Sequence, residues 1–313
     1  MQKPPPTLLD LVLVGGGHAH VHVLKMLGMP LYRKWVVETG VQVTLIARDL
    51  HTPYSGMLPG FVSGHYTYDD IHLDLVKLCR FSNTRLIHAA AEKITYNSSN
   101  KYGGGMVYCS DGRPPIRFDA LSIDVGITPA TSQIKAQQNG AVDSIIPVKP
   151  IAKFCNYYRE LQKTIVSKCS KQNGNQKEPH IVAVVGGGAG GIELAMSMDY
   201  YFKNQGYGDH VQVVICTRGK SMLDSHNERV QTIFRRILKE RHIHVYFQAE
   251  VVDIQPMMQQ DNRRSLLVLS KATEKFHSKP IVVDDVLWCT QAEAAEWLSE
   301  RTPFDTTKRG NFI

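Results

Sequence analysis

The feature that most constrains this chain is the segment Pro179–Asp199, PHIVAVVGGGAGGIELAMSMD. Residues 181–185 form an apolar, mainly β-branched run, which predicts a strand buried on both faces of a parallel sheet. Gly186, Gly188 and Gly191 follow at GxGxxG spacing, ahead of a run of good helix formers. Such glycines permit a tight turn, close approach of a pyrophosphate, and packing of the helix on the strand. The segment therefore predicts a dinucleotide site at a helix N-terminus, with a purely structural turn as the alternative.

A second glycine-rich turn lies near the N-terminus. Residues 8–14, LLDLVLV, precede Gly15, Gly16 and Gly17, and a helical pattern follows. His20 stands where the third glycine of the pattern would be. Two turns of this kind predict two bound dinucleotides rather than one.

Each turn opens a βαβ pattern that is followed by short strands, so the chain reads as an architectural duplication. The expected fold is α/β, with two Rossmann-like dinucleotide-binding domains. Residues 1–150 are expected to form the first domain, 151–280 the second, and 281–313 a return to the first. The polar run at 168–178, KCSKQNGNQKE, predicts a linker ahead of the second βαβ pattern.

A loop is predicted over 51–64, HTPYSGMLPGFVSG, because this stretch is rich in Gly, Pro and Ser. It is too apolar for a simple solvated connection, so we expect it to line a pocket. An ordinary packed loop is the alternative. Residues 68–79 carry apolar side chains at helical spacing and predict a helix.

Composition excludes several other classes of protein. The 313 residues are 43% apolar and 21% charged, as in soluble globular proteins. No apolar run approaches the length needed to span a bilayer, and the N-terminus resembles neither a secretory signal nor a transit peptide. A cytoplasmic location is therefore expected. The six cysteines include no CxxC or CxxxxC pair, which argues against a disulfide framework, a zinc ribbon and a dithiol redox centre.

The formal net charge of +7 is mild for this length. Its main cluster lies on the predicted helix 226–241, and we interpret it as a solvated face rather than as a nucleic-acid or membrane surface. His18 and His22 share a helical face, but no acidic residue or cysteine is near them in sequence, so no metal site is predicted.

Five segments in order resemble the pyridine nucleotide oxidoreductases, flavoproteins with two dinucleotide-binding domains and a glutathione-reductase-like fold. They are the first turn, DALSIDVG at 119–126 with Pro129, Lys149-Pro150, the second turn with GIELA, and DVLWCT at 285–290. The stretches GGGHAH and TPYSGMLPGFVSGHY are similar to the flavoprotein domain joined to selenide, water dikinase. The chain resembles type II NADH dehydrogenases more distantly.

The resemblance implies FAD in the first domain, NAD(P)H in the second, and hydride transfer from the nicotinamide to the flavin. Since the cysteine pair of the disulfide reductases is missing, electrons would leave for an acceptor such as a quinone. A selenide, water dikinase module is a candidate partner. The alternative function is a non-catalytic nucleotide-binding or scaffold protein.

The sequence ends at Gly310-Asn-Phe-Ile313, where the superfamily continues into a Gly-Asp strand that contacts the flavin. The expected fold is therefore C-terminally truncated, and FAD retention is expected to be weak. The acid that binds a ribose hydroxyl is also displaced, because the second strand ends in Ala47-Arg48-Asp49.

The resemblance and the motifs together give the candidate site residues. For FAD they are Gly15, Gly16, Gly17, His18, His20, Asp49, Ser55, Pro59 and Gly126, with His18 or His20 expected near the pyrophosphate. For NAD(P)H they are Gly186, Gly188, Gly191 and Arg218. Arg218 favours NADPH, because no acid follows the strand there and a 2′-phosphate would fit.

The candidate catalytic residues are Glu193, Tyr54 and Lys149, and each has an alternative reading. Glu193 is expected in the first turn of its helix, where it would assist proton movement or simply complement the helix dipole. Tyr54 would line the flavin or pack within its loop. Lys149 would approach the flavin or lie on the surface ahead of a proline.

Overall fold

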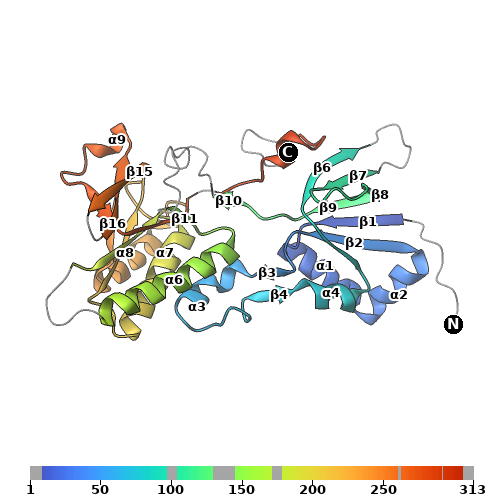
Figure 1. The fold of residues 1–313 in the computed structure, drawn as a ribbon, viewed down its shortest axis with the longest axis horizontal. Coiled ribbons are helices and arrows are strands. Elements are labelled where there is room, and N and C mark those ends of the chain that lie inside the picture. Colours follow the sequence, from blue (N-terminus) through green and yellow to red (C-terminus); the bar gives the residue numbers. More distant parts are fainter. Residues whose placement is uncertain are drawn as a thin grey trace. The chain divides into compact units, whose positions relative to one another are not determined.

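The computed structural model describes residues 9–96, 104–129, 145–170, 178–259, 262–290 and 292–305. Most of the predicted linker at 168–178 and the chain end at 310–313 lie outside these ranges. The chain forms two compact units (Figure 1). Unit 1 comprises Met1–Tyr54, His72–Ile127 and Glu293–Ile313, and unit 2 comprises Ser55–Ile71 and Thr128–Ala292.

Unit 1 is built on a parallel sheet. Its strands are β1 (Leu9–Val14), β2 (Val41–Ala47), β3 (His51–Pro53), β4 (His72–Asp74), β5 (Arg85–His88), β6 (Ala91–Tyr96), β7 (Gly105–Cys109), β8 (Ile116–Phe118) and β9 (Ala120–Ile123). Its helices are α1 (His18–Gly28), α2 (Pro30–Thr39), α4 (Leu75–Ser82) and α10 (Trp297–Glu300). The parallel sheet has the order β5-β2-β1-β9, and β6, β7 and β8 form a separate antiparallel sheet.

Both faces of this parallel sheet are covered, as the apolar run in β1 predicts. Leu13 points to one face, where it packs with Leu24 of α1 and Leu75 of α4. Its neighbours Val12 and Val14 point to the other face and belong to the cluster of the antiparallel sheet. Successive strand residues face opposite sides, so a strand covered on both faces needs apolar residues throughout.

Unit 2 repeats this plan around a second parallel sheet. Its strands are β10 (Thr128–Pro129), β11 (Ile145–Pro147), β12 (His180–Val185), β13 (Val211–Cys216), β14 (His244–Tyr246), β15 (Val251–Gln259), β16 (Asn262–Leu269), β17 (Ile281–Val283) and β18 (Asp285–Trp288), and β19 (Ala292–Glu293) pairs with β10. Its helices are η1 (Ser55–Met57), α3 (Leu58–Val62), α6 (Ile151–Ser170), α7 (Ala189–Asn204), α8 (Glu228–Glu240) and α9 (Lys271–Glu274).

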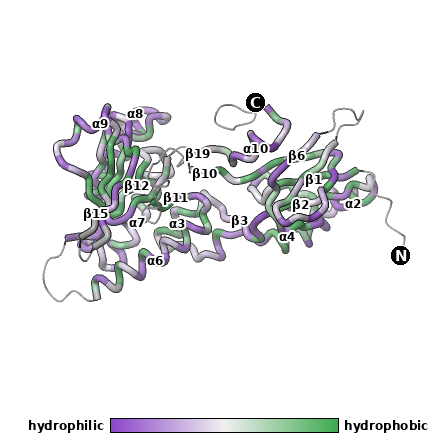
Figure 2. Tube along the Cα trace, turned by 45° about the horizontal axis from the view of Figure 1, so that its top comes forward, coloured by the Kyte–Doolittle hydropathy of each residue, from purple (hydrophilic) through white to green (hydrophobic). Residues whose placement is uncertain are grey.

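The parallel sheet of unit 2 has the order β11-β18-β12-β13-β14. Val182 and Val184 pack with the helices, whereas Ala183 and Val185 pack toward the antiparallel sheet β15-β16-β17. Hydrophobic segments accordingly mark these strands in Figure 2. The prediction of an α/β fold with two Rossmann-like units is confirmed. The assignment of 1–150, 151–280 and 281–313 to FAD, NAD(P) and FAD binding stays a prediction.

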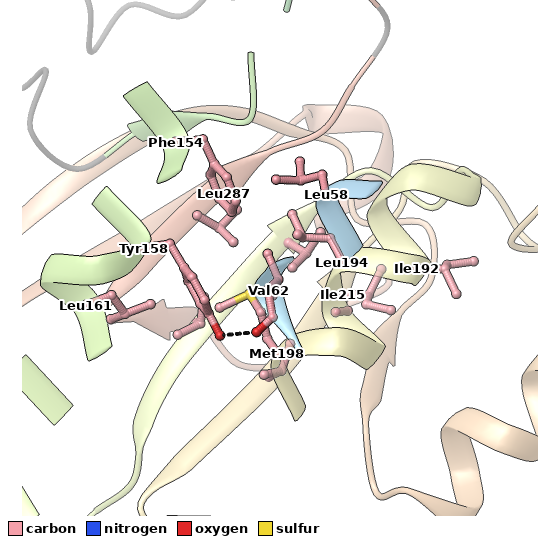
Figure 3. Close-up of a cluster of buried hydrophobic side chains, with 14 of the residues drawn as sticks. Leu58, Val62, Phe154, Tyr158, Leu161, Ile192, Leu194, Met198, Ile215 and Leu287 are labelled. Carbon is pink, nitrogen blue, oxygen red and sulfur yellow. Dashed lines mark hydrogen bonds between the residues drawn. The ribbon is translucent and has the colours of Figure 1, made fainter. Parts of the chain in front are cut away.

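The predicted loop at 51–64 is wrong in part. Its first residues form β3, which pairs with β4, and the stretch between these strands contains η1 and α3. The apolar residues Leu58, Phe61 and Val62 are buried in the main core of unit 2, so core packing explains these three. Leu58 and Val62 are labelled in Figure 3. The expectation that the stretch lines a pocket stays a prediction. The predicted helix at 68–79 is also wrong at its start, because β4 precedes α4.

One hydrogen bond fixes α3 to this core. The hydroxyl of Tyr158, on α6, donates to the carbonyl oxygen of Val62 at 2.8 Å (Figure 3). Tyr158 is fully buried and packs edge-on against Phe61 and Phe202. The core of unit 2 therefore includes a segment whose chain neighbours on both sides belong to unit 1.

Replacing Tyr158 by phenylalanine tests this bond. The variant keeps the ring but leaves the buried Val62 carbonyl without its donor, which should lower the free energy of unfolding by about 1–3 kcal/mol. Urea unfolding followed by circular dichroism measures the change. Tyr200→Phe is the matched control, since Tyr200 is exposed, and it should change stability by less than about 0.5 kcal/mol. Equal stability of the two variants would contradict a stabilising role for the bond.

Candidate functional site

The second glycine-rich turn connects β12 to α7 and requires glycine at its first position. Gly186 has a φ of +134° and donates its N–H to the carbonyl oxygen of Cys216 at 2.9 Å. A Cβ on Gly186 would lie 2.6 Å from the carbonyl oxygen of Cys289, at the end of β18. At Gly191 an added Cβ would collide with the carbonyl oxygen of Gly186. Both glycines are therefore needed for the close approach of helix and sheet.

Gly188 is different, because a Cβ added there meets no atom within 4 Å. It is the N-cap residue of α7, and its carbonyl oxygen accepts the N–H of Ile192 at 3.1 Å. Within the part of the chain that the structure describes, no acceptor takes the N–H of Gly188 or Ala189. The turn thus presents open space and free donors at a helix N-terminus, the arrangement that holds a phosphate.

The segment after β13 borders this turn. Leu223 donates its N–H to the carbonyl oxygen of Gly187 at 2.9 Å and is buried despite a φ of +56°. Arg218 and Lys220 are exposed, and neither has an ion pair within the described residues. Sequence reasoning missed Lys220. A second cation two residues after Arg218 could have been noticed as a further candidate for binding phosphate. Asp224 lies in the same segment, and it accepts a short hydrogen bond from the Ser221 hydroxyl.

The two cysteines at this turn, Cys216 and Cys289, have raised pKa values. Burial raises the pKa of the Cys216 thiol and of the Cys289 thiol to about 12. Both thiols therefore stay protonated near neutral pH, and the thiolate is the reactive form. All six cysteines of the chain are free in the structure.

Four other candidates also belong to unit 2. Glu193 is exposed and is the fifth residue of α7, so its expected place in the first helical turn is wrong: the helix begins at Ala189. Lys149 is half-buried just after β11. Ser55 is exposed in η1. Pro59 lies in α3, where its carbonyl oxygen accepts the N–H of Ser63 at 2.9 Å.

The first glycine-rich turn connects β1 to α1 with similar backbone geometry. Gly15 has a φ of +96° and donates its N–H to the carbonyl oxygen of Ile46 at 2.8 Å. A Cβ on Gly15 would collide with the carbonyl oxygen of Asp124, and one on Gly16 would collide with Leu75. Gly17 is the N-cap of α1, and its N–H donates to the Asp124 carbonyl oxygen at 3.1 Å.

The two histidines of this turn point in different directions. His18 is exposed, and its ring centroid lies 4.8 Å from that of Tyr54, so these two candidates meet. His20 is 1% exposed, and its ring nitrogens lie 2.7 Å from the Gly15 carbonyl oxygen and 2.9 Å from the Ser122 hydroxyl. Of the two histidines, His18 is thus the one with an exposed side chain, and its place near the pyrophosphate stays a prediction. The ring of His20 fixes the turn, and this explains why a side chain replaces the third glycine.

The remaining first-unit candidates lie where the parallel strands end. Asp49 follows β2, is exposed and pairs with Arg48 at 2.9 Å. Gly126 follows β9, and a Cβ added there would meet no atom within 4 Å. Sequence reasoning missed Asp124, whose carboxylate accepts the N–H of His20 at 3.1 Å and lies against Gly17. The signal was present, because an acid directly after a strand of a parallel sheet lies at the edge where the glycine turns lie.

The structure therefore gathers the candidates into two groups. Unit 1 holds Gly15, Gly16, Gly17, His18, His20, Asp49, Tyr54 and Gly126, and unit 2 holds Ser55, Pro59, Lys149, Gly186, Gly188, Gly191, Glu193 and Arg218. Among the described residues, no cluster of His, Cys, Asp or Glu has the makings of a metal site. No helix in the described ranges has the length and apolar content to span a bilayer.

Comparison with known proteins agrees with this geometry. The family described as pyridine nucleotide-disulphide oxidoreductase matches residues 9–313, so the chain belongs to this family. The predicted superfamily is thus confirmed, and its enzymes use FAD and NAD(P)H. No curated protein matches the chain significantly.

Solved structures share the fold at low sequence identity. An NAD-dependent persulfide reductase from A. fulgidus has a TM-score of 0.70 at 16% identity, over 96% of this chain and 49% of that one. NDH2 from Plasmodium falciparum, in complex with NADH, has a TM-score of 0.68 at 16% identity, over 93% of this chain and 56% of that one. The sulfide:quinone oxidoreductase from Aquifex aeolicus has a TM-score of 0.67 at 14% identity, over 97% of this chain and 63% of that one. The chain thus spans from about half to less than two thirds of the length of these proteins.

Proposed function

We propose that the protein is an FAD-dependent NAD(P)H oxidoreductase that passes electrons from NAD(P)H through the flavin to a small acceptor. The observation that carries the proposal is the open, donor-rich N-terminus of α7 at Gly188. Such a turn suits the pyrophosphate of a dinucleotide. Gly186 and Gly191 would hold the backbone close, and Gly188 would admit the phosphates.

For NAD(P)H we assign the adenosine end to the segment after β13. Arg218 and Lys220 are exposed cations without ion-pair partners among the described residues. A 2′-phosphate favours such cations, whereas a carboxylate at the strand end favours the free ribose hydroxyl of NADH. Asp224, an acid of this segment, accepts a hydrogen bond from the Ser221 hydroxyl. We therefore infer a preference for NADPH.

For FAD we assign the first turn and its surroundings in unit 1. The open face of Gly126, the exposed His18–Tyr54 pair and the exposed Asp49 at the end of β2 fit the ends of a dinucleotide. Bound FAD supplies hydride acceptance and onward electron transfer. Tyr54 would line the ring, Glu193 would assist proton movement, and Lys149 would approach the flavin.

The proposed electron acceptor is supported by the cysteines of the chain and by the proteins that share its fold. The six cysteines include no CxxC or CxxxxC pair, so we propose direct electron transfer from the flavin rather than transfer through a dithiol. A quinone is the proposed acceptor, since NDH2 and a sulfide:quinone oxidoreductase share the fold. Association with a selenide, water dikinase module and a cytoplasmic location complete the proposal.

The proposal is tested with the purified chain reconstituted with FAD. We expect a flavin absorbance that is bleached by NADPH and restored by a soluble quinone analogue. Turnover should be faster with NADPH than with NADH. A flavin that binds but is not reduced by either nucleotide would contradict the proposed activity.

A second candidate is a non-catalytic nucleotide-binding protein. The position of the Asp124 carboxylate favours this candidate. The carboxylate fills the space beside Gly17 in the first turn, whereas the equivalent space beside Gly188 in the second turn is open. Under this reading the chain binds NADPH at Gly188 but takes up no FAD at any concentration. Parallel titrations with the two dinucleotides separate the candidates.

Replacing Arg218 by alanine tests the cofactor preference. NADPH binding should weaken by about 1.5–3 kcal/mol, the range for a charge-assisted hydrogen bond, while NADH binding should be unchanged. Lys220→Ala should give a smaller loss of the same kind. Arg235→Ala, on the exposed side of α8, removes the same charge elsewhere and should affect neither cofactor. Isothermal titration measures all four proteins, and an equal loss for NADH and NADPH would refute the assignment.

A further inference from the structure

The two glycine turns have equivalent backbones, which allows a direct comparison within one chain. The N–H of Asp124 donates to the carbonyl oxygen of Val14, the last residue of β1, at 2.8 Å. In the same way, the N–H of Cys289 donates to the carbonyl oxygen of Val185, the last residue of β12, at 2.8 Å. The first glycine of each turn also lies against the carbonyl oxygen of this donor residue. A Cβ added to Gly15 would collide with the Asp124 oxygen, and one added to Gly186 would collide with the Cys289 oxygen. Asp124 and Cys289 are thus equivalent positions.

The side chains at these positions differ in charge and in reach. A Cβ added to Gly188 meets no atom within 4 Å, whereas one added to Gly17 would collide with the Asp124 carboxyl group. One carboxylate oxygen also accepts the N–H of His20, in the first turn of α1, at 3.1 Å. The side chain of Asp124 therefore fills the space beside Gly17 and engages one helix donor, the His20 N–H, that would otherwise be free for a phosphate.

We propose that Asp124 is a built-in competitor for dinucleotide phosphate at the first turn and determines how tightly this turn binds FAD. A carboxylate and a pyrophosphate carry like charges, so both at one helix N-terminus repel each other. The backbone of Asp124 is fixed by its bonds to Val14 and Gly17, so the carboxylate leaves by side-chain rotation alone. Binding of the dinucleotide requires that rotation. This inference rests on the proposed assignment of FAD to unit 1.

The test is titration of the full chain with FAD, followed by the change in flavin fluorescence. Asp124→Asn keeps an oxygen acceptor for the His20 N–H but removes the charge, and it should bind FAD about tenfold more tightly than the unmodified protein. Asp124→Ser shortens the side chain and should also bind more tightly. The serine variant keeps the measurement decisive if the asparagine variant does not fold, and circular dichroism establishes folding.

Asp119→Asn is the matched control, because it removes the same charge at the other end of β9. Asp119 accepts the N–H of Asp10 at 2.8 Å and contacts Arg117, away from the turn. Its FAD affinity should equal that of the unmodified chain. Equal or weaker FAD binding by Asp124→Asn and Asp124→Ser, in a protein that does bind FAD, would overturn the inference and leave the proposed function standing. Absence of FAD binding in every variant would overturn both.

Discussion

Replacing Gly188 by valine is expected to abolish NADPH binding while leaving the fold intact. Because an added Cβ at Gly188 meets no protein atom within 4 Å, the side chain extends into open space and costs the folded state little. That space is where we assign the pyrophosphate, so the branched side chain should weaken binding by about a hundredfold or more, equal to about 2.8 kcal/mol. Isothermal titration with NADPH measures the loss.

Gly188→Ala grades the same effect, since a single methyl group intrudes less and should give a smaller loss of affinity. Both variants should stay folded, with a stability loss of about 1 kcal/mol or less from the weaker N-cap preference of alanine and valine. Retained NADPH affinity in the folded valine variant would remove Gly188 from the proposed site. A valine variant that unfolds early would show instead that the space beside Gly188 is needed for packing.

Replacing Gly191 by alanine should have the opposite signature, a large loss of stability. The added Cβ would collide with the carbonyl oxygen of Gly186, a backbone atom that cannot move without opening the contact between α7 and β12. Overpacking costs about 1–3 kcal/mol, occasionally more, and we expect the upper end here because the neighbour is backbone. Chemical unfolding measures the free energy, and the midpoint of the transition should fall.

Gly190→Ala is the matched control for that result. It is the adjacent residue of α7, and its Cβ would meet nothing within 4 Å. Alanine is the better helix former by up to about 1 kcal/mol, so this variant should be equally stable or more stable. Similar stability losses at Gly190 and Gly191 would show that helix flexibility, rather than the contact with Gly186, determines the effect.

The sequence was sufficient for the fold because local patterns and tertiary packing agree in both sheets. Residues 181–185 are apolar throughout, and the structure covers both faces of β12. The stretch at 51–64 could not be read in the same way. Its glycines and prolines predicted a loop, yet Leu58, Phe61 and Val62 are buried by contacts with α6 and α7, which lie about a hundred residues later in the chain.

The candidate site shows the same division between local and distant causes. The role of Gly186 as a tight turn is a backbone property that its motif encodes, and its φ of +134° agrees with it. His20 is at the motif position of a glycine, but its burial depends on Ser122, about a hundred residues away. The Asp124 carboxyl group, which fills the space beside Gly17, is also about a hundred residues away in sequence. Contacts between distant residues of this kind leave no periodic signal in a single sequence.

The placement of Ser55–Ile71 has a consequence for how this protein folds. The chain crosses between the units after Tyr54, Ile71, Ile127 and Ala292, so neither unit is one continuous piece. A fragment starting at Thr128 would lack α3 and leave the Tyr158 hydroxyl without its acceptor. Such a fragment exposes apolar core surface, which favours aggregation. The core of unit 2 is complete only when α6 and α7 pack against a segment that precedes them by about a hundred residues. Its folding therefore depends on contacts of high sequence separation, which form slowly.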